Sequence, residues 1–194
     1  SFGIALGKAA KEAARLDDLA TAAGRVGITA EALQELQHAA EASDVPVAQL
    51  QKGLEALNGS IGAIQTGLGA GRVSKAFAEL GISETQLRSI RTADELLPLL
   101  ADKISGLEST ATQVQIANKL GIEELLPLLR QGSGGIDDFR KKARDLGLVM
   151  DEDVVQASAA MNEQLRIVDE QARAATSRLA VEFIPTLVAL KTQA

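Results

Sequence analysis

Neighbouring carboxylates are the main side chains in this sequence that could do chemistry. They occur at Asp17/Asp18, Glu123/Glu124, Asp137/Asp138 and Asp151/Glu152/Asp153. Two close carboxylates can transfer protons in acid–base catalysis or ligate a hard metal ion. Most of these groups fall at expected helix N-termini, where the helix dipole favours negative charge. We therefore interpret them as helix-capping residues.

Other reactive side chains are scarce. The chain of 194 residues has no cysteine, which excludes disulfides, zinc–thiolate sites, iron–sulfur clusters and thiol nucleophiles. Its single histidine, His38, leaves no second imidazole for a His-based metal site, and we expect it on the surface near the end of its helix. We predict that the protein is not an enzyme and has no catalytic, cofactor-binding or metal-binding residues.

Positive charge is not in surplus. The chain carries 20 Lys and Arg against 26 Asp and Glu, and this net charge of −6 argues against nucleic acid as a partner. The basic run 140–144 could bind a phosphate, but nearby aspartates balance its charge. We expect this run to be a solvated helix face.

Glycines are concentrated between residues 59 and 71. This stretch lacks the Lys-Ser/Thr ending of a P-loop and follows no expected strand, so it does not fit a phosphate-binding loop. We expect a hinge or loop here, because each glycine disfavours a helix. A membrane-active or partner-binding segment is the alternative, since Ile61, Ile64 and Leu68 interleave with small residues.

Composition favours helices over strands. Hydrophobic residues make up 46% of the chain and aromatic residues only 2%, and alanine and leucine are abundant. Alanine and leucine are strong helix formers, whereas strands favour aromatic and β-branched residues. We predict an all-α protein, built as an array of short helices punctuated by glycine and followed by one long C-terminal helix.

The helices are expected from apolar residues at steps of three and four. Thr29 and Ser83 are expected helix caps, and Thr92 with Glu95 fits a capping box, in which each side chain accepts a free backbone N–H. Pro46 is expected at the start of a helix. The first expected helix begins at residue 4 and is ended by Gly24 or Gly27, and the second follows Thr29 and stops at 43–46. The other expected helices cover 46–57, 73–80, 83–90, 93–105, 110–120, 122–130 and 136–146, with a turn at 131–135.

One short motif occurs twice. Glu95–Leu100 has the sequence ELLPLL, which recurs at Glu124–Leu129, 29 residues later. Proline is tolerated in the first turn of a helix, where its missing N–H has no partner. We interpret both copies as helix starts and not as a solenoid repeat.

The segment from 154 to 179 carries an unbroken heptad pattern. Its apolar and small residues advance by alternating steps of four and three: Val154, Ser158, Met161, Leu165, Val168, Ala172, Ala175 and Leu179. This spacing is compatible with a coiled coil, formed within the chain or between chains. The small residues bury little area, so we expect a weaker seam than a leucine zipper. The candidate helix–helix interface residues are Val154, Met161, Leu165, Val168, Ala172, Ala175 and Leu179.

The pattern predicts two regions. Residues 1–150 are expected to form a multi-helix region with a Gly-rich loop near 59–71, and 151–194 a long heptad-patterned helix that kinks or ends at Pro185. No apolar run is long enough to cross a membrane. The start at Ser1, without an initiator methionine, suggests a fragment of a longer chain.

An ordered set of motifs resembles a known family. It comprises Leu80–Leu87 (LGISETQL), Glu124–Gly132 (ELLPLLRQG), Gly147-Leu148 and the acidic start 151–153 of a long Ala-rich helix. This order is similar to that of the tail tape measure proteins of long-tailed bacteriophages and prophages. The resemblance covers about 26–184 and is strongest from 80 to 168.

The resemblance implies a structural, non-enzymatic role. Such a protein would lie in the tail tube of the virion, set the tube's length during assembly in the bacterial host cytoplasm, and leave ahead of the DNA. Its partners would be tail tube and tail tip proteins, tail assembly chaperones and further copies of itself through the C-terminal helix. A helical protein- or lipid-interaction module without catalysis is the alternative function.

Overall fold

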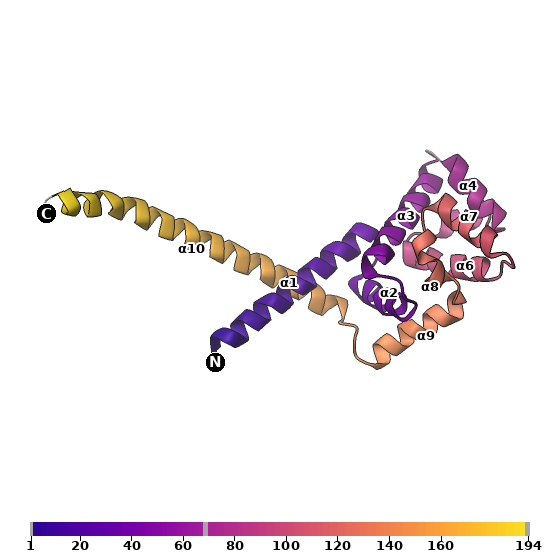
Figure 1. Ribbon diagram of the computed structural model, residues 1–194, viewed down its shortest axis with the longest axis horizontal. Helices are drawn as coiled ribbons and strands as arrows, with labels where there is room; N and C mark the ends of the chain where they lie inside the picture. Colours follow the sequence, from indigo (N-terminus) through magenta and orange to yellow (C-terminus); the bar gives the residue numbers. More distant parts are fainter. Residues whose placement is uncertain (1, 68–69, 193–194) are drawn as a thin grey trace. The chain divides into compact units, whose positions relative to one another are not determined.

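The computed structural model describes residues 2–67 and 70–192. Within these residues every regular element is a helix, so the predicted all-α class is confirmed (Figure 1). The elements are α1 (Phe2–Val26), α2 (Ala30–Ala42), α3 (Val47–Thr66), α4 (Ala70–Glu79), α5 (Glu84–Ser89), α6 (Ala93–Ser105), α7 (Thr110–Leu120), the 3-10 helix η1 (Glu123–Leu125), α8 (Leu126–Leu129), α9 (Gly132–Asp145) and α10 (Glu152–Thr192).

Most helix boundaries follow local sequence signals. Thr29 Oγ1 accepts the N–H of Ala32 at 3.1 Å, and Ser83 forms a capping box with Gln86. α1 ends before Gly27 and α7 before Gly121, both with φ +70, a left-handed conformation that glycine adopts without strain. These caps confirm the expected starts at Thr29 and Ser83.

The capping box expected at Thr92 does not form. Thr92 is the N-cap residue of α6, but its hydroxyl makes no capping hydrogen bond. The Glu95 carboxylate accepts the N–H of Arg91 at 2.8 Å, one residue before the cap. The carboxylate therefore satisfies a backbone donor ahead of the helix, and the reciprocal bond from Thr92 is missing.

The Gly-rich stretch is helical over much of its length, so the loop expected from residue 59 is wrong for 59–66. α3 continues through Gly59 and Gly62 to Thr66. Leu57, Ile61 and Ile64 are buried on one face of this helix. Burial of these side chains stabilises the helix by more than the glycines cost it, at roughly 1 kcal/mol each.

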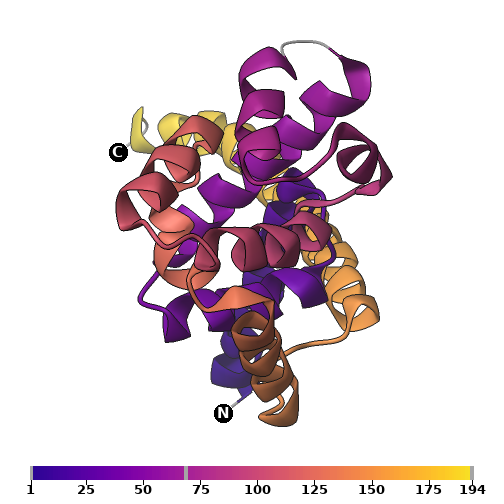
Figure 2. The ribbon, with the colours of Figure 1, turned by 90° about the vertical axis from the view of Figure 1, so that its right-hand side faces the viewer.

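Residues 18–155 form one compact unit. In this unit α2 packs on α3 and α9, α3 on α4 to α7, and α6 on α8 and α9. Figure 2 shows α3 and α4 side by side. The largest fully buried side chains are Phe77, Leu33, Leu36, Leu50, Leu54, Leu57, Ile64, Leu96, Leu97, Leu100, Ile104 and Ile116.

The expected turn at 131–135 is also wrong, because α9 already begins at Gly132.

Residues 1–17 and 156–194 form the other compact unit. Within it, Asn162 Nδ2 donates a hydrogen bond to Asp17 Oδ2 at 2.9 Å. The bounds of α10 extend past Pro185, so the helix does not end there, and a kink at Pro185 stays a prediction. Proline removes one backbone hydrogen bond, and the remaining hydrogen bonds on either side can keep the helix continuous. These units divide at 17/18 and 155/156, whereas the predicted regions meet at 150/151.

Candidate functional site

Part of the predicted interface is an exposed apolar stripe on α10. Met161, Leu165 and Val168 lie there with exposed fractions of 48%, 41% and 60%. At 3.6 residues per turn, these three positions fall within about 60° of one another around the helix. We call these three residues the α10 stripe. Large hydrophobic side chains this exposed, and in phase along one helix, are typical of a surface that binds another apolar surface.

Of the other four predicted interface residues, one has a described side chain and three do not. Val154 is also exposed, at 47%, but it belongs to the compact unit 18–155. The side chains of Ala172, Ala175 and Leu179 lie outside the described part of the structure. The role of all seven residues as an interface stays a prediction.

Charges on α10 pair along the helix itself. Arg166 binds Glu163 at 2.8 Å and Glu170 at 2.5 Å, and Arg173 binds Asp169 at 2.8 Å. The hydrogen bond from Arg166 holds the pKa of Glu163 below its ordinary value. Such exposed pairs contribute little to stability. They offset two of the three negative charges beside the α10 stripe, so a second helix could approach it without strong repulsion.

A second polar arrangement, which sequence reasoning missed, joins α2 to α9. The Glu35 side chain is only 8% exposed, and its carboxylate accepts hydrogen bonds from Arg140 Nε at 2.8 Å and from Arg144 Nη1. Burial raises the pKa of this carboxyl, but the hydrogen bonds and charges of Arg144 and Arg140 outweigh burial, so the pKa of Glu35 lies below its ordinary value.

This ion pair corrects the expectation of a solvated face at 140–144. Arg140 is only 19% exposed, whereas Arg144 is 52% exposed and binds Glu35 from the rim. The helical period places Arg140, Arg144 and the buried Ala143 on the same side of α9. The basic run therefore serves an internal contact through two of its members, while Lys141 and Lys142 are exposed as expected.

Two further contacts extend the polar surface of α2. Gln34 Nε2 donates to the Met150 carbonyl and Gln34 Oε1 accepts the Met150 N–H, both at 3.1 Å. Glu31 Oε1 accepts the N–H of Glu152 at 2.8 Å, and Glu152 Oε2 accepts the N–H of Ala30 at 2.7 Å. Each glutamate thus caps the N-terminus of the other's helix. We call Glu31, Gln34, Glu35, Arg140, Arg144, Met150 and Glu152 the α2 polar cluster.

The acidic pairs fit structural roles more than chemical ones. Glu152 does cap a helix, but it caps α2 instead of its own. Asp17 binds Asn162, and Asp137 and Asp138 are exposed on α9. Among the described residues, no three His, Cys, Asp or Glu side chains lie close enough to hold a metal ion.

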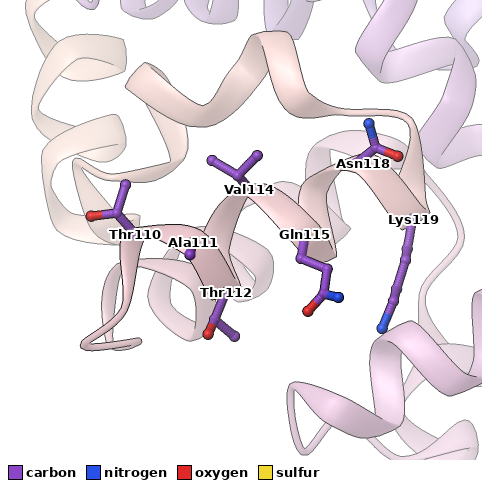
Figure 3. A pocket seen from close by; sticks show the side chains of 7 residues that line it. All are labelled: Thr110, Ala111, Thr112, Val114, Gln115, Asn118 and Lys119. Atoms are coloured by element: carbon purple, nitrogen blue, oxygen red, sulfur yellow. The ribbon is translucent and has the colours of Figure 1, made fainter.

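An open depression lies on α7 (Figure 3). Thr110, Thr112, Gln115, Asn118 and Lys119 line it together with Ala111 and Val114. Lys119 Nζ binds both carboxylate oxygens of Glu79, at 2.8 and 2.6 Å. The lining offers hydroxyl and amide hydrogen bonds, and its lysine, Lys119, is held in the ion pair with Glu79.

The alternative role of the Gly-rich stretch in membranes is contradicted for two residues. Ile61 and Ile64 are 4% and 1% exposed in α3, where they cannot insert into a lipid surface, and Leu68 lies outside the described residues. None of the described helices combines the length and hydropathy that a membrane crossing needs.

His38 is half-buried on α2.

Comparison with known proteins adds no relative. No family model, curated protein or solved structure matches this chain.

Proposed function

We propose that this chain is a segment of a phage or prophage tail tape measure protein, which sets tail-tube length and occupies the tube lumen. The ordered motifs between 80 and 168 support the proposal, as does the all-helical fold. The observation that carries it is the unbroken heptad pattern from 154 to 179. We propose that this pattern belongs to one long helix, which converts residue count to length at about 1.5 Å per residue.

The proposal includes a specific architecture. The short helices, several of which end at a left-handed glycine, form an array that leads into one long C-terminal helix. The heptad pattern then pairs this helix with others in a coiled coil. The compact packing of 18–155 belongs to the isolated chain, and the array takes an extended form inside the tube. Tail tube proteins, tail tip proteins and assembly chaperones are the partners that hold it there.

Deletion and duplication of heptads test the ruler directly. Removing residues 154–181 from the gene in its phage or prophage takes out four heptads and keeps their phase. Tails should shorten by about 42 Å at 1.5 Å per residue, and duplicating the same segment should lengthen them by the same amount. Electron microscopy of tails measures both changes.

A length-neutral substitution provides the control. Leu165→Asp alters the α10 stripe without changing the residue count, so any tails that form should keep the parent length. Unchanged length in both the deletion and the duplication would contradict the proposal.

A helical protein-interaction module is the second candidate. The exposed α10 stripe favours it, because a surface of this kind binds an apolar partner. The heptad deletion separates the two candidates. Loss of an interaction module would leave the length of the assembled tails unaltered.

A further inference from the structure

Apolar contacts anchor α9 more weakly than its neighbour α6. Among the described side chains of α9, the buried ones are Ile136 and Ala143. In contrast, α6 is of similar length and buries a whole face, formed by Ala93, Leu96, Leu97, Leu100, Ala101 and Ile104. Segments with few buried apolar contacts open at low free-energy cost.

Polar contacts supply most of the anchors of the segment after Ile136, whose buried apolar side chains are Ala143 and Val155. Glu35 binds Arg140 and Arg144, Gln34 binds the backbone of Met150, and Glu31 exchanges caps with Glu152. The three α2 side chains lie within residues 31–35, so a single patch of α2 receives the whole segment. The loss of one contact therefore exposes the next to water.

Glycines mark both ends of α9. Gly132 has φ +70 and Gly147 has φ +65. Leu146 and Leu148, on either side of Gly147, are exposed at 59% and 54% and do not anchor the chain. The backbone can therefore rotate at Gly147 without breaking apolar packing.

We propose that residues 137–155 form a strap, which the α2 polar cluster holds on α2 and which opens as one unit while α3 and α6 stay folded. The detached strap loses its helix, because an isolated helix of this length is marginal in water. This inference rests on contacts within residues 18–155 and does not depend on the role proposed for the chain in tails.

Hydrogen exchange of the full chain tests the strap. In the wild type, backbone amides of 137–155 should exchange at least about tenfold faster than those of α3 and α6. Glu35→Gln keeps the shape of the side chain but removes its charge, and it should accelerate exchange in the strap a further 10- to 100-fold. Amides of α3 and α6 should stay at least about tenfold slower than those of the strap in both chains.

A matched variant and a second probe complete the experiment. Glu55→Gln removes an exposed pair with Arg25, whose atoms are 3.9 Å apart, and should leave the strap unaffected. The chain has no cysteine, so Ala143→Cys in the strap and Ala101→Cys in α6 each place one buried thiol. The thiol at 143 should be alkylated faster than the thiol at 101 in the otherwise wild-type chain, even if Glu35→Gln does not fold.

Three results would overturn the strap. The first is equal exchange or alkylation of the strap and α6 in the wild type. The second is exchange of the strap, α3 and α6 at one common rate in Glu35→Gln, which would make the cluster a part of the global stability alone. The third is a Glu35→Gln chain that folds with no faster exchange in the strap.

Discussion

Glu35 shows how one buried carboxylate can stabilise a contact that apolar burial does not. Removing a carboxylate from water is costly, and here two guanidinium groups compensate for that cost through hydrogen bonds and charge. The result is a pKa of Glu35 below its ordinary value in the folded protein. A group with a lowered folded pKa contributes stability above its unfolded pKa and loses it as the pH falls through the folded value.

The stability of the wild type relative to Glu35→Gln should therefore depend on pH. At pH 7 the substitution should lower the free energy of unfolding by about 2–3 kcal/mol, because it leaves Arg140 poorly paired. The difference should shrink once the pH falls below the ordinary pKa of 4.5 and through the lower folded value. Urea unfolding of both chains at several pH values measures it. An equal difference at neutral and acidic pH would contradict the role assigned to Glu35.

Single residues were predictable where their partners are close in sequence. Thr29 caps a donor three residues away, and Ser83 does the same. Glu35 is 105 residues from Arg140, so no local pattern could join them. The i, i+4 spacing of Arg140 and Arg144 was the available signal, but it equally fits a solvated helix face.

At the scale of elements, helix boundaries with local signals were predicted well. α6 and α7 begin and end at the residues expected, 93–105 and 110–120. The end of α3 was not predicted correctly, because helix propensity includes the cost of Gly59 and Gly62 but not the burial of Ile61 and Ile64. Tertiary packing decided this helix, and the sequence alone does not show what it packs against.

Two glycines of α3 should respond in opposite ways to alanine. Gly59 is exposed, with no neighbouring atom within 4 Å of an added Cβ, so Gly59→Ala should stabilise the chain by about 0.5–1 kcal/mol. At Gly53 an added Cβ would lie 2.5 Å from Cδ1 of the fully buried Leu125, so Gly53→Ala should destabilise by about 1–3 kcal/mol. Urea midpoints compare the two. If both changes stabilise the chain, the close packing of Gly53 on Leu125 is wrong.

At the scale of the whole molecule, the heptad pattern and the compact core pose different problems for prediction. The pattern is local, so the sequence predicts which residues share one face of α10. Residues 18–155 and the remaining residues form separate compact units, and that division depends on contacts distant in sequence, such as Asn162 with Asp17. The sequence accordingly predicted the helices of both units better than the residues at which the two units divide.

The α10 stripe should make the chain self-associate. Its three residues are exposed, and the ion pairs of Arg166 and Arg173 offset most of the adjacent negative charge, so two copies can meet along the seam. Light scattering should show a molar mass that rises with concentration toward a dimer or higher assembly. Leu165→Asp should abolish this rise, because it places a charge in the seam.

Ala174→Asp adds the same charge on the opposite side of the helix and should leave the assembly intact. A wild-type chain that stays monomeric at every concentration would contradict an interface between copies. Equal loss of assembly in both variants would point to charge in general and not to the stripe. Loss with Leu165→Asp alone places the contact on the face that the heptad pattern marks. A seam of valine, methionine and small residues buries little apolar area, so the loss of one leucine layer is enough to separate the copies.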